Sequence, residues 1–364
     1  MVEVSAKENG MKFGIMNLFP AEGANDHKVL QDTLEEIQFA DQLGFDSAWL
    51  AEHHFSRYGI LGNPLLMGAA IASTTKRISI GTAVLVLPFH DPIRLAEDIA
   101  TLDVLSNGRL KVGIGRGYQP LEFSGFNRIA EESRDVYSEV VQILQKAWTE
   151  EGWSFEGKHF NYKDMTVYPK PTSAGGPTLL HATVSPDSYR DRGLKGESII
   201  TSPNFTPLPL MQKNFDVYRN SLVEGGFDPA DFEIPFMQQV WCGHSREDLE
   251  RAATAALTYY RSLNKVIPGS EEAVESEAKY YDAVRRNIDL LTLDKALTHG
   301  GNFGSVNQVV DNLGKLRDVL GVNHYIGWFH IPSMDRKMAM DAMENFAAEV
   351  IPQLREKTPV SSLA

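Results

Sequence analysis

The stretch Trp49-Leu-Ala-Glu-His-His-Phe-Ser-Arg-Tyr-Gly-Ile-Leu-Gly-Asn-Pro64 joins an apolar segment directly to a cluster of polar side chains. The apolar run at 47–51 predicts a buried parallel strand, and Glu52, His53 and His54 follow it at once. In α/β proteins, functional sites form where parallel strands end. We therefore expect the chemistry to lie at this point, with the rest of the chain as scaffold or cofactor cradle.

Composition and charge narrow the class of protein. The 364 residues include 43% hydrophobic side chains, enough for one large core, and the formal net charge is −13. No run of Lys and Arg is present, which argues against nucleic acid as a partner. No apolar stretch approaches the ~20 residues of a membrane span, which argues against a membrane protein. The single cysteine, Cys242, excludes an internal disulfide and a cysteine-based metal site. We expect a cytoplasmic protein.

Eight apolar segments alternate with helical patterns along the chain. Eight strand–helix units predict an α/β fold of the (β/α)8 barrel type, also called a TIM barrel, and a doubly wound sheet is the main rival. We expect one domain at 11–357, with a polar disordered leader at 1–10, which lacks the apolar centre of a secretory signal, and a tail at 358–364. The strands are expected at 12–18, 47–51, 78–86, 109–115, 178–182, 198–201, 235–242 and 324–328.

Two segments interrupt the repeating pattern. Residues 152–168 are rich in aromatics and glycine and predict a surface hairpin. Residues 262–301 carry many charges and no clear strand signal, which is typical of a lid or another functional insertion. Among the helices, Asp26 is expected to cap the first one, and Pro92 is expected to start another.

Small and hydroxyl-bearing residues after two strands could form an anion site. Gly115-Arg116-Gly117 places a guanidinium between glycines, where a backbone can approach a ligand closely. Thr183 and Ser185 precede a helix that would begin at a proline, so hydroxyls and free N–H groups converge there and could bind a phosphate. The alternative is that the arginine pairs with Glu97 or Asp98 and that Ser185 is only a helix cap.

The paired histidines do not form a pattern typical of a metal site. The HExxH motif is absent, and adjacent side chains on a strand point to opposite faces, so His53 and His54 are not expected to share an ion. At least one of them is expected to be structural. His53 stays in register with Trp49 and Ala51, and a histidine at a strand end suits proton transfer. We expect no metal.

Several motifs in this order resemble one known family. The similarity runs from about Met11 to the C-terminus and is weaker after Trp153. The chain resembles the catalytic subunit of bacterial luciferase, a flavin-dependent monooxygenase, in Leu50-Ala-Glu-His-His-Phe-Ser-Arg-Tyr-Gly-Ile-Leu-Gly-Asn-Pro64, Gly81-Thr-Ala-Val-Leu-Val-Leu-Pro88, Pro92-Ile-Arg-Leu-Ala-Glu-Asp98, Leu102-Asp-x-Leu-Ser-x-Gly-Arg109 and Gly113-Ile-Gly-Arg-Gly117.

The resemblance implies the oxygenase half of a two-component system on a (β/α)8 barrel. A separate flavin reductase would supply reduced FMN, and molecular oxygen would add to the flavin as a C4a-peroxide. That species would oxidise a small to medium organic substrate of the aldehyde or ketone type. The resemblance also implies a dimer, either a homodimer or a heterodimer with a related chain, which would pair through residues 64–74 and 92–106.

The resemblance assigns roles to particular positions. His53 matches the family's catalytic histidine, and the Ala83–Val84 bond matches a non-prolyl cis peptide beside the flavin ring. The segment at 262–301 matches the family's lid. The positions that match the family's FMN phosphate site are Arg116, Arg134, Ala182, Thr183 and Ser185.

Two positions depart from the family pattern, and other functions stay open. Gly115 replaces a cysteine beside the flavin, which should enlarge the pocket and puts light emission in doubt, and His181 replaces a glutamate of the phosphate loop. One alternative is a deazaflavin-dependent oxidoreductase that moves hydride. A second is a flavin-binding partner subunit that needs another chain for catalysis, and a more distant one is a metal-dependent barrel hydrolase.

Overall fold

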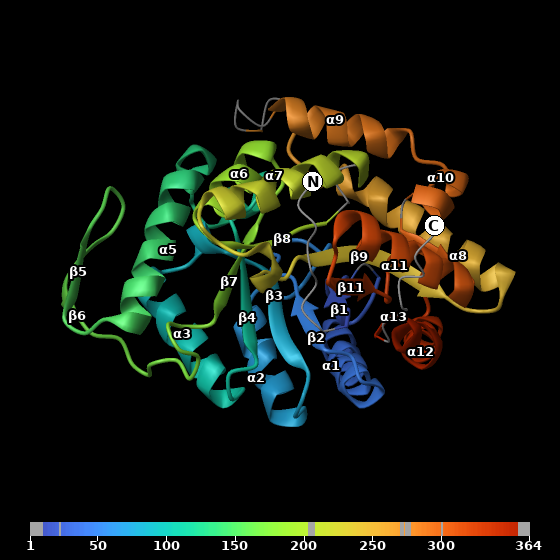
Figure 1. Ribbon diagram of the computed structural model, residues 1–364, viewed down its shortest axis with the longest axis horizontal. Coiled ribbons are helices and arrows are strands. Elements are labelled where there is room, and N and C mark those ends of the chain that lie inside the picture. The colour runs from blue at the N-terminus through green and yellow to red at the C-terminus, as the bar shows by residue number, and fades with distance from the viewer. Residues whose placement is uncertain are drawn as a thin grey trace, which may run out of the picture.

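A computed structural model describes residues 10–21, 23–202, 208–269, 273, 278–299 and 301–355. Within these residues, eight parallel strands form a barrel, and the predicted fold class is confirmed (Figure 1). The two ends of the sheet meet where Thr201 bridges to Phe236, with hydrogen bonds from Thr201 N to Pro235 O (3.1 Å) and from Met237 N to Thr201 O (3.0 Å). In order around the barrel the strands are β1 (Lys12–Asn17), β2 (Ser47–Leu50), β3 (Ser79–Val86), β4 (Leu110–Gly115), β7 (Thr178–Ala182), β8 (Ser198–Ile200), β9 (Pro235–Cys242) and β11 (His324–Trp328).

Three further strands of the described residues lie outside the barrel. β10 (Asn302–Gly304) extends the sheet by pairing with the end of β9. β5 (Trp153–Glu156) and β6 (Asn161–Met165) form an antiparallel pair, which lies beyond α5 at the edge of Figure 1. The predicted surface hairpin is therefore confirmed.

Helices surround the barrel and follow the expected spans closely (Figure 1). The longer ones are α1 (Asp26–Leu43), α2 (Pro64–Thr74), α3 (Pro92–Leu105), α5 (Ser133–Thr149), α6 (Pro186–Leu194), α7 (Leu208–Glu224), α8 (Arg246–Leu263), α9 (Ala278–Asp289), α11 (Val306–Leu320) and α12 (Arg336–Asn345). The short ones are α4 (Pro120–Gly125), α10 (Leu293–His299), α13 (Ile351–Arg355), the 3₁₀ turns Leu87–Phe89, Ala130–Glu132 and Pro229–Asp231, and a π-helical turn at Phe346–Val350.

Local capping chemistry sets the helix boundaries. Asn63 caps α2 ahead of Pro64, and Ser305 forms a capping box with Gln308 at the start of α11. The predicted cap at Asp26 is wrong by one residue, because the side chain of Asn25 accepts the hydrogen bond from Lys28 N. Asn and Asp are both good N-caps, so the sequence alone did not separate these neighbours.

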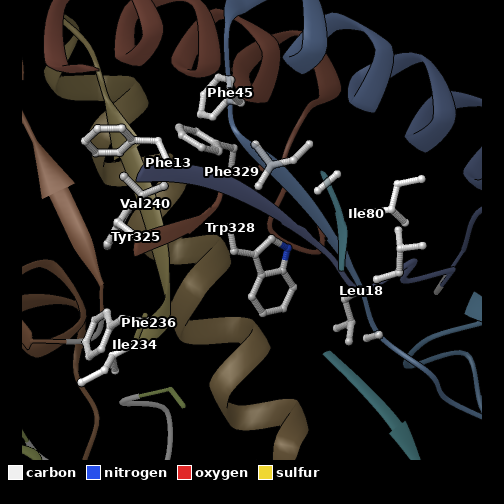
Figure 2. Packing of buried hydrophobic residues seen from close by; sticks show 14 of the residues in the cluster. Phe13, Leu18, Phe45, Ile80, Ile234, Phe236, Val240, Tyr325, Trp328 and Phe329 are labelled. Carbon is white, nitrogen blue, oxygen red and sulfur yellow. The ribbon is translucent and has the colours of Figure 1, made fainter. Parts of the chain in front are cut away.

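The core has two layers because successive strand side chains point to opposite faces. Trp49, Leu180, Ile200 and Ile326 fill the barrel interior. A Cβ on Gly81 would lie 2.3 Å from the Trp49 ring, so only a glycine leaves room for this indole. The other layer packs against the helices, where Phe45 and Phe329 meet edge to face at 5.7 Å (Figure 2).

Some of the expected features fall partly outside the described residues. The leader at 1–9 and the chain after 355 lie outside them, as do 270–272, 274–277 and 300 within the predicted lid. The described part of that segment contains the helices α9 and α10 joined by turns, with α9 at the top of Figure 1. The domain limits and the lid function stay predictions. Among the helices that the structure describes, none is long and apolar enough to cross a membrane.

Candidate active site

His53 is held by a buried carboxylate that comes from the loop after a different strand. Its Nδ1 lies 3.1 Å from Glu122 Oε1, and the same oxygen accepts the hydrogen bond of His54 N at 3.0 Å. Glu122 lies in the short helix α4, which Pro120 begins, and it is almost fully buried. The loops after β2 and β4 therefore meet at this hydrogen-bonded contact.

The contact with Glu122 determines which nitrogen of His53 carries the proton. An ionised carboxylate can only accept, so Nδ1 must donate its hydrogen to Glu122. The side-chain amide of Gln119 lies 3.0 Å from the same Nδ1. Because Nδ1 cannot then accept, we orient this amide with its oxygen towards the ring. Nε2 makes no hydrogen bond within the described residues and is left to accept a proton.

His54 enters a separate network centred on Glu52. His54 Nε2 donates to Glu52 Oε1 at 2.9 Å, and His90 Nε2 approaches both carboxylate oxygens at 3.0 and 3.1 Å. Val86 N also donates to Oε2 at 3.0 Å. Both oxygens of this buried carboxylate therefore accept hydrogen bonds from the protein itself. We call this the closed network, because Glu52 has no oxygen left for a ligand.

The charges in this second network support each other. Burial alone would raise the pKa of Glu52, but hydrogen bonds from His54 and His90 lower it below its ordinary value. Burial opposes the charge on His90 as well, yet its hydrogen bond to Glu52 raises the pKa of the imidazole. An opposite charge at hydrogen-bond distance outweighs the loss of solvation here.

Three tyrosines extend the polar contacts near His53. Tyr58 packs edge to face on the His53 ring, with centroids 4.8 Å apart, and its hydroxyl lies 2.6 Å from that of Tyr259. Tyr118 also hydrogen-bonds to Tyr58. Burial raises the pKa of Tyr118 to about 12 and the pKa values of the other two phenols well above the ordinary range. All three hydroxyls therefore keep their protons at neutral pH.

Small residues lie towards the carboxyl ends of β3, β4 and β7. The Ala83–Val84 peptide bond is cis, so this expectation is confirmed. A Cβ on Gly115 would lie 2.6 Å from Val84 Cγ2 and 3.7 Å from Ala182 Cβ, which places β3, β4 and β7 in contact. The expectation that Gly115 enlarges the pocket is wrong, because Val84 fills the space a side chain would take.

The predicted phosphate residues are only partly brought together. Arg116 lines a pocket of about 300 Å³ that Ser133 also lines, whereas Arg134, the next residue, is exposed and does not line it. Thr183 is buried, and its hydroxyl donates to His181 O at 2.8 Å. Ser185 caps α6, as its alternative interpretation proposed. The alternative in which Arg116 pairs with Glu97 is weakened, because Glu97 Oε2 already lies 2.7 Å from Arg94 Nη1.

His181 lies buried below this region. Tyr137 donates its hydroxyl hydrogen to His181 Nδ1 at 2.5 Å. Burial and then the positive charges of Arg192 and Lys195 lower the pKa of His181 to about 3, so the ring is neutral. The related family has a glutamate at this position, which would carry a negative charge, whereas His181 is uncharged. That arrangement is compatible with an anion nearby.

Several of the groups that surround His53 were not predicted from the sequence. Glu122 and Gln119 follow the Gly113–Gly117 motif by only a few residues, so extending the search along that loop would have found them. Tyr259 gave no usable signal, because it lies in a helix 201 residues from its partner Tyr58. Within the described residues, no group of three or more His, Cys, Asp or Glu side chains is placed to hold a metal ion.

The residues present fit a flavin. Ala182 is exposed at the end of β7 and lies close to Gly115 of β4 and Val84 of the cis peptide, so only small side chains would face a ring system here. Arg116 lines the neighbouring pocket together with Tyr118, which belongs to the tyrosine cluster. The phosphate of a flavin cofactor could therefore bind near Arg116, and its planar ring could lie against the small residues.

Comparison with known proteins agrees with this geometry. The model of the luciferase-like monooxygenase family matches residues 11–324. The oxygenase component of the flavin-dependent trigonelline monooxygenase of Acinetobacter baylyi is 27% identical over 349 residues, which cover 90% of this chain and 91% of that protein. Among solved structures, the monooxygenase RslO1 of Streptomyces bottropensis is 26% identical with a TM-score of 0.82, covering 94% of this chain and 99% of its own.

Two more distant structures share the fold. The oxygenating constituent of 3,6-diketocamphane monooxygenase from Pseudomonas putida, in complex with FMN, has a TM-score of 0.79 at 20% identity and covers 95% of this chain and 99% of its own. An F420-dependent secondary alcohol dehydrogenase has a TM-score of 0.76 at 19% identity, with coverages of 95% and 100%. The family model spans most of the chain, so the chain belongs to the luciferase-like monooxygenase family and is a flavin-dependent monooxygenase.

Proposed function

We propose that this protein is the oxygenase component of a two-component system that uses FMN reduced by a separate flavin reductase. Its substrate would be a small to medium organic molecule of the aldehyde or ketone type. The observation that carries this proposal is the contact between His53 and the buried Glu122, which joins the loops after β2 and β4. Bound reduced FMN would supply the electrons and the site of oxygen activation.

The chain's own residues would orient the cofactor. Arg116 would hold the phosphate, with Arg134 at the start of α5 as the second cation that the family resemblance assigns. Ala182, Thr183 and Ser185 would form the loop around the phosphate and ribityl chain. Thr183 would support the shape of this loop, since its hydroxyl donates to His181 O and its N–H donates to Ile200 O.

His53 would move the proton. Glu122 keeps the hydrogen on Nδ1, so Nε2 is the atom that would take a proton from the substrate or give one back. The carboxylate would also stabilise the imidazolium formed when Nε2 is protonated. Tyr58 would restrict the ring orientation by its edge-to-face contact.

The partners would be the reductase, molecular oxygen and a second chain. α2 and α3 expose large apolar side chains, with Leu66 71% and Leu105 62% exposed, which suits a dimer interface. The second chain would be an identical copy or a related one.

Oxygen uptake tests the proposal. The purified chain would be supplied with a flavin reductase, NADH and FMN, and then with a panel of aldehydes and ketones. We expect substrate-dependent oxygen consumption, with one atom of isotopically labelled dioxygen entering the product. Arg116→Gln should weaken FMN binding while leaving binding of riboflavin, which lacks the phosphate, unchanged. Reoxidation of reduced FMN at the rate of the free flavin, with no labelled product, would contradict the proposal.

The second candidate is a deazaflavin-dependent hydride transfer, which the fold shared with an F420-dependent dehydrogenase supports at the level of fold alone. Reduced F420 would then be oxidised by a ketone under strictly anaerobic conditions. Turnover in the absence of oxygen would favour this candidate over the oxygenase.

A further inference from the structure

Gln119 brings a second polar group to the imidazole of His53. It lies at the N-cap position of α4, directly before Pro120, and its side chain makes no capping hydrogen bond. The best N-caps have short side chains, so a glutamine at this position is available for another contact. Its amide lies 3.0 Å from Nδ1 of His53. Only 1% of Gln119 is exposed, so the amide meets protein groups and not solvent.

The backbone of α4 fixes the place of this amide. Gln119 O accepts hydrogen bonds from Glu122 N at 3.1 Å and from Phe123 N at 3.2 Å. Residues three apart are neighbours on a helix surface, so one turn brings two side chains to the same ring nitrogen. Glu122 Oε1 lies 3.1 Å from Nδ1, and the Gln119 amide lies 3.0 Å from it. The single hydrogen on Nδ1 is therefore shared between two acceptors.

The other end of the amide reaches the tyrosine cluster. The side chain of Gln119 hydrogen-bonds to Tyr118, and Tyr118 hydrogen-bonds to Tyr58. Tyr58 in turn packs edge to face on the His53 ring, with centroids 4.8 Å apart. Four side chains thus form a closed loop of contacts, from Nδ1 through the amide and two phenols back to the imidazole. Burial raises the pKa of both phenols, so the tyrosines add no charge to this loop.

The donors and acceptors of this loop favour one arrangement of hydrogens. The oxygen of an amide only accepts, and its nitrogen only donates. With the Gln119 oxygen on the Nδ1 hydrogen, the amide nitrogen faces Tyr118, whose phenol oxygen can accept. A neutral ring with its hydrogen on Nε2 would instead place a bare nitrogen opposite the Glu122 carboxylate and would require the amide to turn over. Both side chains of α4 therefore favour the tautomer that carries its hydrogen on Nδ1.

We propose that Gln119 is a positioning residue of the proton-transfer step, which holds His53 as the Nδ1–H tautomer and leaves Nε2 to exchange the proton. This inference rests on the proposed function, because it concerns the step in which His53 exchanges a proton with the substrate. Glu122 supplies charge to the imidazolium, whereas Gln119 supplies orientation without charge. The imidazolium also carries a hydrogen on Nδ1, so the loop need not rearrange when Nε2 is protonated.

Nitrogen NMR tests the inference on the full chain, without turnover. The histidine rings would be labelled with ¹⁵N, and His53→Asn would identify the His53 signals among the ten histidines. At a pH where the ring is neutral, the chemical shifts of its two nitrogens show which one carries the hydrogen. We expect Nδ1–H in the wild type. Gln119→Met keeps the size of the side chain and loses the amide, so the share of the Nε2–H tautomer should rise about 2- to 10-fold, the effect of losing one neutral hydrogen bond.

Two further variants complete the test. Tyr118→Phe removes the phenol oxygen that accepts from the amide and should change the tautomer ratio in the same direction by a smaller factor. It keeps the inference testable if Gln119→Met does not fold. Gln142→Met, at an exposed position of α5, is the matched control and should leave the ratio unchanged.

Two results would overturn the inference. One is an Nε2–H tautomer in the wild type, and the other is the same tautomer ratio in the wild type and in Gln119→Met. If the inference holds, kcat of Gln119→Met should also fall about 2- to 10-fold, while the dissociation constant of FMN stays unchanged. The NMR results do not depend on oxygen uptake, which tests the proposed function separately.

Discussion

His53 and His54 are adjacent in the chain but belong to networks of different kinds. His53 shares one buried carboxylate, that of Glu122, and leaves Nε2 without a partner in the described structure. His54 shares Glu52 with His90, and in this network both oxygens of the carboxylate are used. The same residue type thus serves two purposes, because neighbouring side chains leave the strand end in opposite directions. The open network suits proton transfer, and the closed one suits stability.

The largest effect is expected from a change in the open network, which consists of His53 and Glu122. His53→Asn removes the nitrogen that accepts a proton, so kcat with reduced FMN should fall by about 10²- to 10⁴-fold. The midpoint of urea unfolding should change little. His54→Asn is the matched change, and we expect the reverse pattern, with a lower unfolding midpoint and a smaller loss of kcat. Equal losses of kcat in the two variants would contradict the separation of the networks.

Breaking the closed network should mainly reduce stability. Glu52→Gln removes the charge that His54 and His90 share inside the protein, so the free energy of unfolding should fall by about 3 kcal/mol. Urea denaturation measures it. Glu97→Gln is the control, because it breaks an exposed pair with Arg94 and should cost less than about 1 kcal/mol. A similar loss in both variants would show that burial of Glu52 has no special importance.

Glu122→Gln sharpens the comparison by keeping the shape of the open network and removing its charge. The amide can no longer stabilise the imidazolium, so kcat should fall at least about tenfold. The dissociation constant of reduced FMN, measured anaerobically, should stay unchanged, because Glu122 does not lie in the predicted phosphate site. A loss of FMN affinity with an unchanged kcat would mean that Glu122 serves cofactor binding instead of proton transfer.

The smallest expected effect concerns pH. The pKa of His90 is raised, so the contribution of its ion pair is fully present below the ordinary value of 6.5 and is lost as pH rises through the raised pKa. The pKa of Glu52 is lowered, so its contribution is present above the ordinary value of 4.5 and is lost as pH falls through the lowered pKa.

The difference in unfolding free energy between the wild type and Glu52→Gln should therefore be largest between pH 4.5 and 6.5. It should decrease on both sides of that window. Urea titrations from about pH 4 to about pH 9 would measure it. A difference that does not vary with pH would mean that the network is held by neutral hydrogen bonds alone.

The sequence by itself determined the repeating units of the fold. Apolar strands and helix-starting prolines such as Pro92 are local signals, and the structure has the elements where these signals predicted them, although the first helix is capped by Asn25 and not by Asp26. The resemblance to a known family added the cis bond at Ala83–Val84, which is present. His53 was predicted as the catalytic residue because it comes just after a strand, where parallel sheets present their functional groups, and that role stays a prediction.

Only the tertiary structure decided which groups surround that histidine. Glu122 lies 69 residues from His53, and Tyr259 lies 201 residues from Tyr58. Closure of the barrel brings these pairs together, and no local pattern encodes a contact between such distant positions. The sequence likewise did not reveal that Val84, from the neighbouring strand β3, fills the space beside Gly115. Local residue preferences specify the elements, whereas packing between distant elements specifies the site.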